Sequence, residues 1–174
     1  ERGTLMHALF ERLPAVEPLA RRKVALDWLE RMAADFEAID RSAMVDAVLS
    51  VIEDAAFSPL FGPDSLAEVP FSALVEGRVV AGSIDRLLVN ETVVRVIDYK
   101  TGAHVPEAEG DVPIGYLRQM GAYAAALAVI FPGRTIEAAL LFTGGPHLIM
   151  LSDAMIAAHK PDFAEGKAKL TAAS

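Results

Sequence analysis

Residues 82–101 read GSIDRLLVNETVVRVIDYKT, which places two apolar runs on either side of a short polar break. The full runs are Arg78–Val89 and Thr92–Lys100, and Val, Ile and Leu dominate both, as is typical of β-strands. The polar break at Asn90 and Glu91 has the composition of a turn. The pattern therefore predicts a β-hairpin.

Three charged residues lie within these two strands, where a plain buried hairpin would carry none: Asp85, Asp98 and Lys100. A two-residue turn at the polar break puts Val96 opposite Asp85 and Ser83 opposite Asp98, so the two aspartates are diagonal neighbours on the face that carries Lys100. Diagonal neighbours lie roughly 7–8 Å apart, and a divalent cation with oxygen ligands at about 2.0–2.1 Å could bridge two carboxylates so placed. A salt bridge between Lys100 and an aspartate at a sheet edge would explain the same charges without any chemistry. The three residues by themselves leave both interpretations open.

Four short segments follow one another along the chain: GTLMHALFERL, GSIDRL, VIDYKTG and YLRQMGAYAAAL. Together they resemble the RecB-type nuclease domains of the PD-(D/E)xK superfamily, in particular the C-terminal nuclease domain of the alphaproteobacterial AddA helicase–nucleases. The resemblance extends from Gly3 to about Leu151. Its specific part is the ordered set of a His, an Asp, the D-x-K pair and Q-x-x-x-Y. It implies an α/β fold of the restriction-endonuclease-like type, a mixed β-sheet flanked by helices, with a helical N-terminal part.

The resemblance implies a metal site made of residues that match the family motifs. Asp85 and Asp98 would bind the metal, and His7, in a G-x-x-x-H setting on the first helix, would be a third ligand. A neutral imidazole is a workable ligand beside two carboxylates. Glu68 is a possible further member, because the family often has a Glu at this place. The alternatives are a structural role for His7 and an edge-strand charge beside Pro70 for Glu68.

The resemblance also implies a catalytic group and its supporting residues. Lys100 would orient or activate water beside the scissile phosphate. Gln119 and Tyr123 match Q-x-x-x-Y and would line the site, with Tyr116 as a possible member of the same helix stripe. Phosphodiester hydrolysis needs such a set, since it requires a Lewis acid, a polarised water and a cation near the developing negative charge. For Tyr116, a place at the margin of a core face is the alternative.

The length of 174 residues predicts one domain, with a helical part over residues 1–56 and a sheet-bearing catalytic core over residues 57–174. In the second helix, Leu19, Val24 and Met32 are among the apolar residues expected to pack inward. The expected elements are helices that end at Pro14 and span Glu17–Phe36 and Asp40–Asp54, strands over Ser65–Val75, Arg78–Val89 and Thr92–Lys100, a helix over Ile114–Ile130, strands over Thr135–Thr143 and His147–Leu151, and a helix capped by Ser152. The helix between Thr92–Lys100 and Thr135–Thr143 predicts that these two strands are parallel.

Composition narrows the class of protein further. The chain has no cysteine, which excludes disulfides and thiolate metal sites, and no apolar run reaches the ~18 residues of a membrane span. No signal peptide is present, so we expect a cytoplasmic protein without a membrane partner. There is no G-x-x-x-x-G-K-[ST] loop, so no ATP site is expected. The net charge of −8 is unusual for a free-standing nucleic-acid binder, and we expect strong DNA binding to belong to a larger protein of which this chain is a fragment.

The function expected from these observations is metal-dependent hydrolysis of DNA, with Mg²⁺ or Mn²⁺ as cofactor. The resemblance implies an exonuclease domain of an ATP-dependent helicase–nuclease that acts in double-strand-break repair and recombination. It also implies single-stranded DNA delivered from duplex ends and an AddB-like partner subunit. The alternative is a catalytically inactive module that keeps the nuclease fold as a DNA clamp or a subunit-docking surface.

Overall fold

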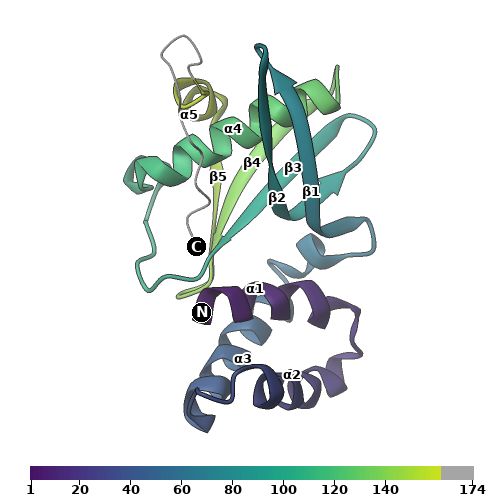
Figure 1. Ribbon diagram of the computed structural model, residues 1–174, viewed down its shortest axis with the longest axis vertical. Helices are drawn as coiled ribbons and strands as arrows, with labels where there is room; N and C mark the ends of the chain where they lie inside the picture. Colours follow the sequence, from purple (N-terminus) through teal and green to yellow (C-terminus); the bar gives the residue numbers. More distant parts are fainter. Residues whose placement is uncertain (162–174) are drawn as a thin grey trace.

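Five strands form one mixed sheet in the order β1-β2-β3-β4-β5 in the computed structural model (Figure 1), which describes residues 1–161. Residues 162–174 of the expected domain lie outside the described residues. Strands β3 and β4 are parallel and the other neighbouring pairs are antiparallel. The strands are β1 (Ser65–Val75), β2 (Arg78–Val89), β3 (Val93–Lys100), β4 (Thr135–Phe142) and β5 (His147–Leu151).

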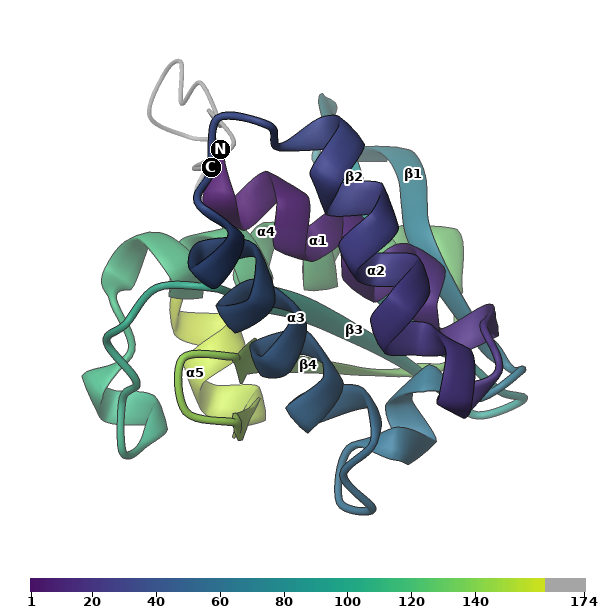
Figure 2. The same ribbon diagram turned by 90° about the horizontal axis from the view of Figure 1, so that it is seen from below.

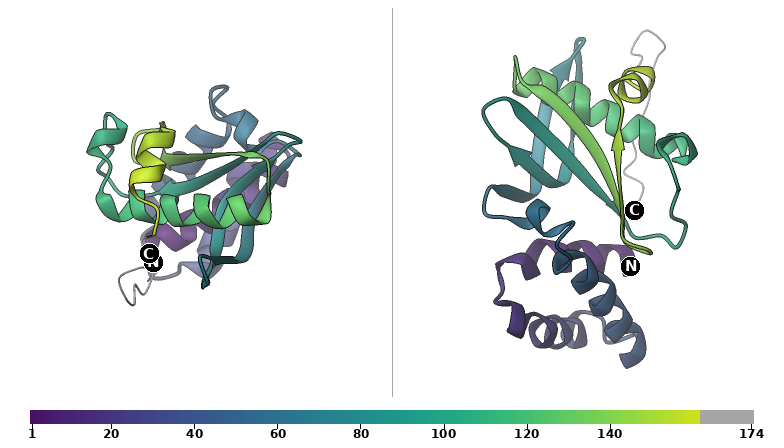
Figure 3. Two further views of the ribbon diagram at one scale, coloured as in Figure 1. Left: turned by 90° about the horizontal axis from the view of Figure 1, so that it is seen from above. Right: turned by 180° about the vertical axis from the view of Figure 1, so that it is seen from behind.

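Helices cover both faces of this sheet. They are α1 (Arg2–Arg12), α2 (Pro18–Met32), α3 (Ala38–Ile52), α4 (Ile114–Ile130) and the short α5 (Asp153–Ala158). Helices α1, α2 and α3 form a group at one end of the molecule (Figures 1 and 2). Within this group α1 and α3 pack on one face of the sheet, and α4 crosses the other face. The two views in Figure 3 show the same layers from above and from behind. This confirms the expected α/β architecture of a mixed sheet flanked by helices, with a helical N-terminal part.

The hairpin of β1 and β2 closes at Glu76 and Gly77, between the paired residues Val75 and Arg78. Both turn residues lie in the left-handed region, with φ of 49° and 80°. A type I′ turn requires positive φ at both central positions, and its twist matches that of the strands. Beyond the turn, one face of the hairpin packs small side chains against the alanines of α4.

The turn between β2 and β3 differs from the predicted one by a single residue. Val89 pairs with Val94, and the Asn90 amide donates to the Val93 carbonyl at 3.0 Å, so the turn residues are 91 and 92. The Asn90 side-chain oxygen sets this turn by accepting the amides of residues 92 and 93 at 2.9 and 2.7 Å. Moving the turn by one residue shifts the register by two. The predicted opposition of Asp85 to Val96 is therefore wrong, because Leu87 pairs with Val96.

Two apolar layers fix β3 between the helices. On one face Val94 and Val96 pack in the cluster beneath α4, and on the other Ile97 and Tyr99 pack with α1 and α3. The parallel pairing of β3 with β4, confirmed from Val93 to Lys100, follows from the crossover through α4. As a result, alternate residues at the end of β3 point to opposite helical layers.

Helix α2 departs from the expectation that its apolar residues pack inward. Leu19, Val24 and Met32 are exposed, while Ala25 and Leu29 are fully buried. Helix α2 packs mainly on α3 along one side, so only a narrow stripe at i, i+4 spacing is covered. Within residues 1–161, no helix is both long and apolar enough to cross a membrane.

Candidate active site

Strands β2 and β3 stop pairing just before the two aspartates. The last paired residues are Arg86 and Ile97, and one step further along lie Asp85 and Asp98. Here the Asp85 carboxylate replaces the next ladder bond, since its Oδ2 accepts the Tyr99 amide at 2.7 Å. The two aspartates are thus directly across from each other at the point of separation, rather than diagonal as predicted. Asp85 is only 9% exposed and Asp98 only 5%.

Glu68 interrupts the pairing of β1 with β2 at the same level. Ala67 pairs with Arg86 and Val69 pairs with Ile84, but Glu68 has no partner in the β1–β2 register and has a φ of 48°. A non-glycine residue in this region costs about 1–3 kcal/mol, and such strain clusters at functional sites. The distortion coincides with a specific placement, because the Glu68 carboxylate joins Asp85 at the site.

His7 reaches this point from α1, on the other side of the strands. Its Nδ1 lies 3.0 Å from Asp85 Oδ1. One turn earlier, a side chain on Gly3 would meet Thr101 Oγ1 at 2.9 Å, so glycine is what allows the start of α1 to approach the end of β3 this closely. His7, Glu68 and Asp85 each present one ligand atom, and these atoms all lie within 4.8 Å of one another.

Electrostatics at this cluster reflect crowded carboxylates around one imidazole. Burial lowers the pKa of His7, but the hydrogen bond and the charge of Asp85 outweigh it and raise the pKa above its usual value. Burial, followed by the charge of Asp85, raises the pKa of Glu68. Burial and the charge of Asp85 also raise the pKa of Asp98 to about 6, against the opposing effect of Lys100. A bound cation would relieve this repulsion between carboxylates.

Lys100 occupies the α4 side of the site and is 8% exposed. Its Nζ lies 2.7 Å from Asp98 Oδ2, donates to Gln119 Oε1 at 2.9 Å and sits 4.0 Å from the centre of the Tyr116 ring. The Gln119 amide nitrogen donates to the Tyr123 hydroxyl at 3.1 Å. Three residues of α4 therefore fix the position of one ammonium group.

Ser83 links the two halves of the site. Its carbonyl accepts from the Tyr123 hydroxyl at 3.1 Å, and its hydroxyl donates to Glu68 Oε2 at 3.2 Å. A continuous chain of contacts thus runs from Lys100 through Gln119 and Tyr123 to Glu68.

Every residue proposed from the sequence takes part in this arrangement, in two groups. His7, Asp85 and Glu68 form the cluster of candidate ligands, and Asp98 pairs instead with Lys100 beside Gln119, Tyr123 and Tyr116. Ser83 and the buried Arg86 were missed as site residues. Nothing in the local pattern singles out Ser83, whereas an arginine inside an apolar strand is a signal of a buried structural partner.

The sequence profile of the PD-(D/E)XK nuclease superfamily matches residues 1–170. The chain belongs to this superfamily. Asp98 and Lys100 have the spacing of a D-x-K pair and lie at the end of β3, which pairs in parallel with β4 in the mixed sheet of this PD-(D/E)XK domain.

A curated relative of the PD-(D/E)XK domain is an ATP-dependent helicase/nuclease subunit of Lactiplantibacillus plantarum, which is 27% identical over 154 residues. The match covers 79% of this chain but only 12% of that protein, so the chain spans about an eighth of the relative's length. Among solved structures, the crystal structure of SSO0001 matches at 19% identity with a TM-score of 0.36, over 88% of this chain and 71% of that one. That likeness is too loose to say anything about the site.

The donor set of the PD-(D/E)XK domain fits a hard divalent cation. The two carboxylates are ligands that suit Mg²⁺ and Mn²⁺, and the imidazole adds a nitrogen ligand of the kind that transition-metal ions bind. Their spread of at most 4.8 Å is close to the roughly 4 Å that separates opposite ligands on one such ion. Only a small inward movement of the side chains would bring the three groups to a common ion.

Proposed function

We propose that this domain hydrolyses DNA phosphodiester bonds with Mg²⁺ or Mn²⁺. His7, Asp85 and Glu68 would hold the ion, with Asp98 as the adjacent candidate ligand. The observation that carries the proposal is the continuous chain of contacts that joins this ligand cluster to a buried, oriented lysine. Burying Asp85, Asp98 and Lys100 together is costly, which favours a catalytic role for them over the inactive module.

When bound, the ion would supply Lewis acidity on the phosphate and lower the pKa of a water. The chain's own residues do the positioning. Lys100 holds a proton-donating ammonium at the edge of the ligand cluster, where it can orient the attacking water and offset developing negative charge. Gln119 and Tyr116 keep that ammonium from rotating away, and Tyr123 ties Gln119 to the backbone of β2.

The name of the curated relative, an ATP-dependent helicase/nuclease subunit, supports a proposal about the wider setting. We propose that the domain is the exonuclease part of an ATP-dependent helicase–nuclease in double-strand-break repair and recombination, which works with an AddB-like partner subunit. In that setting the helicase would deliver single strands to a site that lacks a strong electrostatic attraction of its own. The net charge of −8 supports this division of labour.

The decisive variant is Asp85→Asn, because Asp85 belongs to every ligand set under consideration. The asparagine oxygen can still accept the Tyr99 amide, so the fold is kept while the ligand charge is lost. We expect the parental chain to bind Mn²⁺ in calorimetry and to cleave single-stranded DNA, and the variant to do neither. Cleavage by Asp85→Asn at the parental rate would exclude this site as the active centre.

The inactive-module alternative predicts a different outcome for the parental chain. It would bind DNA in the presence of Mn²⁺ without producing any cleavage over long incubation. Such a result would leave the fold assignment intact and reduce the function to a DNA clamp or a docking surface.

A further inference from the structure

Arg86 is buried beside the site, with 4% of its surface exposed, and its guanidinium joins four elements. It donates from Nη2 to the carbonyl of Phe10 in α1 at 2.7 Å and from Nε to the hydroxyl of Tyr99 in β3 at 3.0 Å. A third, longer bond runs from Nη1 to the hydroxyl of Ser65 in β1 at 3.3 Å. The guanidinium carbon also lies 5.0 Å from the ring centre of Phe61.

None of these partners is a carboxylate, and within residues 1–161 the ion pairs of the structure do not include Arg86. Burying a charge without an opposite charge is costly, and an apolar side chain of similar volume would fill the space more cheaply. Compared with such a side chain, the guanidinium adds several hydrogen bonds to neutral acceptors, donated in the fixed directions of its planar fork of N–H groups. Its contribution is therefore geometric.

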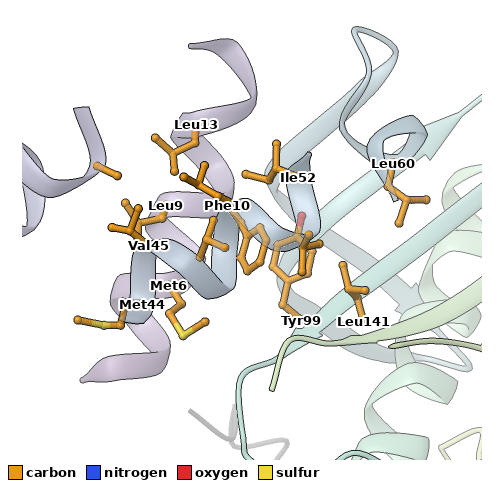
Figure 4. Packing of buried hydrophobic residues seen from close by; sticks show 14 of the residues in the cluster. Met6, Leu9, Phe10, Leu13, Met44, Val45, Ile52, Leu60, Tyr99 and Leu141 are labelled. Carbon is orange, nitrogen blue, oxygen red and sulfur yellow. The ribbon is translucent and has the colours of Figure 1, made fainter. Parts of the chain in front are cut away.

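That geometry converges on His7. Phe10 follows His7 by three residues on α1, so the carbonyl that Arg86 binds belongs to the same helical turn. The ring of Tyr99, whose hydroxyl Arg86 also binds, stands edge-on to the His7 ring with centroids 5.6 Å apart. Figure 4 shows the Phe10 and Tyr99 rings side by side between α1 and the sheet. Their centroids are 4.6 Å apart.

We propose that Arg86 is a positioning residue that holds α1 against β2 and β3 so that His7 meets Asp85. Two adjacent residues of β2 then act on one histidine: Asp85 contacts its ring directly, and Arg86 fixes the helix and the tyrosine ring that support it. As far as it concerns the metal, this inference rests on the proposed function. The placement of His7 itself can be measured without metal.

The experiment compares three variants that remove different parts of the fork. Arg86→Lys keeps the charge but cannot make the forked contacts, Tyr99→Phe removes one hydroxyl, and Ser65→Ala removes the longest bond. Leu29→Ala is the control, since Leu29 is fully buried in α2, so its loss lowers stability, and it makes none of the hydrogen bonds of Arg86. Each protein is measured twice at one fixed pH: by NMR shifts of the His7 ring without metal, and by calorimetry with Mn²⁺.

We expect Arg86→Lys to move the His7 ring resonances and to weaken Mn²⁺ binding at least tenfold. Tyr99→Phe should show both effects to a smaller extent, and Ser65→Ala should match the parental chain. Leu29→Ala should lower the unfolding temperature and leave both readouts unchanged. This pattern separates positioning from a general loss of stability, which would move the Leu29 variant as well.

The proposal is overturned if Arg86→Lys, or Tyr99→Phe should the lysine variant not fold, leaves the His7 resonances and the Mn²⁺ affinity at parental values. Equal losses in the Leu29→Ala control would also overturn it, because they would show that any destabilisation acts in this way. A parental chain that binds no Mn²⁺ would instead count against the proposed function, while the metal-free His7 resonances would still decide the role of Arg86.

Discussion

Replacing Lys100 by methionine tests whether the buried ammonium is a catalytic group or only the partner of a carboxylate. Methionine keeps most of the side-chain volume and removes the charge. The change breaks the 2.7 Å ion pair with Asp98 and the 2.9 Å hydrogen bond to Gln119. Breaking a buried ion pair typically costs about 3–5 kcal/mol when the remaining partner stays charged and buried.

Asp98 does not have to stay charged, because its carboxylate can take up a proton. Its pKa in the metal-free protein is already raised to about 6 by burial and by the charge of Asp85. At pH 7 that pKa is one unit below the pH, so protonating Asp98 costs only about 1 kcal/mol. The charge-dependent part of the destabilisation by Lys100→Met should therefore be about 1 kcal/mol at pH 7.

The sign of the pH dependence follows from the same shift. A carboxyl group whose folded pKa lies above its unfolded value stabilises the fold most at low pH and loses that stability as the pH rises towards the folded pKa. In the parental protein this loss ends near pH 6, and in Lys100→Met it continues above pH 6. The charge-dependent part of the difference between the two proteins should disappear at pH 5 and appear at pH 7, on top of a constant loss from the hydrogen bond to Gln119.

The assay is denaturant unfolding in EDTA at pH 5 and pH 7, combined with Mn²⁺-dependent cleavage at pH 7. The rate should fall on the order of 10²–10³-fold, as for the loss of one preorganised group. Arg95→Met is the matched control, since Arg95 lies on the same strand and pairs with Glu137 at 2.6 Å, but both side chains are about a third exposed. It should cost at most about 1 kcal/mol and leave cleavage unchanged. Cleavage by Lys100→Met close to the parental rate would refute the catalytic role and leave Lys100 as a structural partner.

Three other measurements test separate parts of the site. Glu68→Gln should weaken Mn²⁺ binding at least tenfold in calorimetry, whereas Glu76→Gln, at the other left-handed glutamate, should not; equal affinities would remove Glu68 from the ligand set. Gly3→Ala should weaken Mn²⁺ binding by pushing α1 away from Thr101, and adding Thr101→Ala should restore it; a double variant no better than the single one would contradict this explanation. The chain should bind duplex DNA weakly in Ca²⁺, with a salt slope below about 2 because each neutralised phosphate adds about 0.9; a steep slope would show a basic surface that we have overlooked.

The strands and their faces could be predicted from the sequence because side chains alternate with a period of two. The one-residue error in the turn before Val93 moved the register by two, so each residue stayed on its predicted face while its partner changed. The turn itself could not be predicted from composition, since it is set by the hydrogen bonds of the Asn90 side chain. For this reason the predicted diagonal position of Asp85 relative to Asp98 was wrong, because the register puts them across from each other.

The residues missed by the sequence depend on contacts between distant segments. Arg86 meets Phe10 across 76 positions, and the Ser83 carbonyl accepts from Tyr123 across 40 positions. The left-handed conformation of Glu68 has no local signal, because glutamate rarely adopts it unless the surrounding structure imposes it. Sequence periodicity also overestimated burial on α2, where Leu19 remains exposed.

The two halves of the site are held from opposite faces of the sheet, and this has a consequence for how it can be perturbed. Helix α1 supplies His7 from one side, while α4 holds Lys100 through Gln119 from the other. The halves lie beside each other where the pairing of β2 and β3 ends: Asp85 contacts His7 and the Tyr99 amide, and Asp98 pairs with Lys100. Changes in α1 should therefore alter metal affinity first, and changes in α4 should alter the rate first. Only residues at the point where the strands separate, above all Asp85, should alter both together.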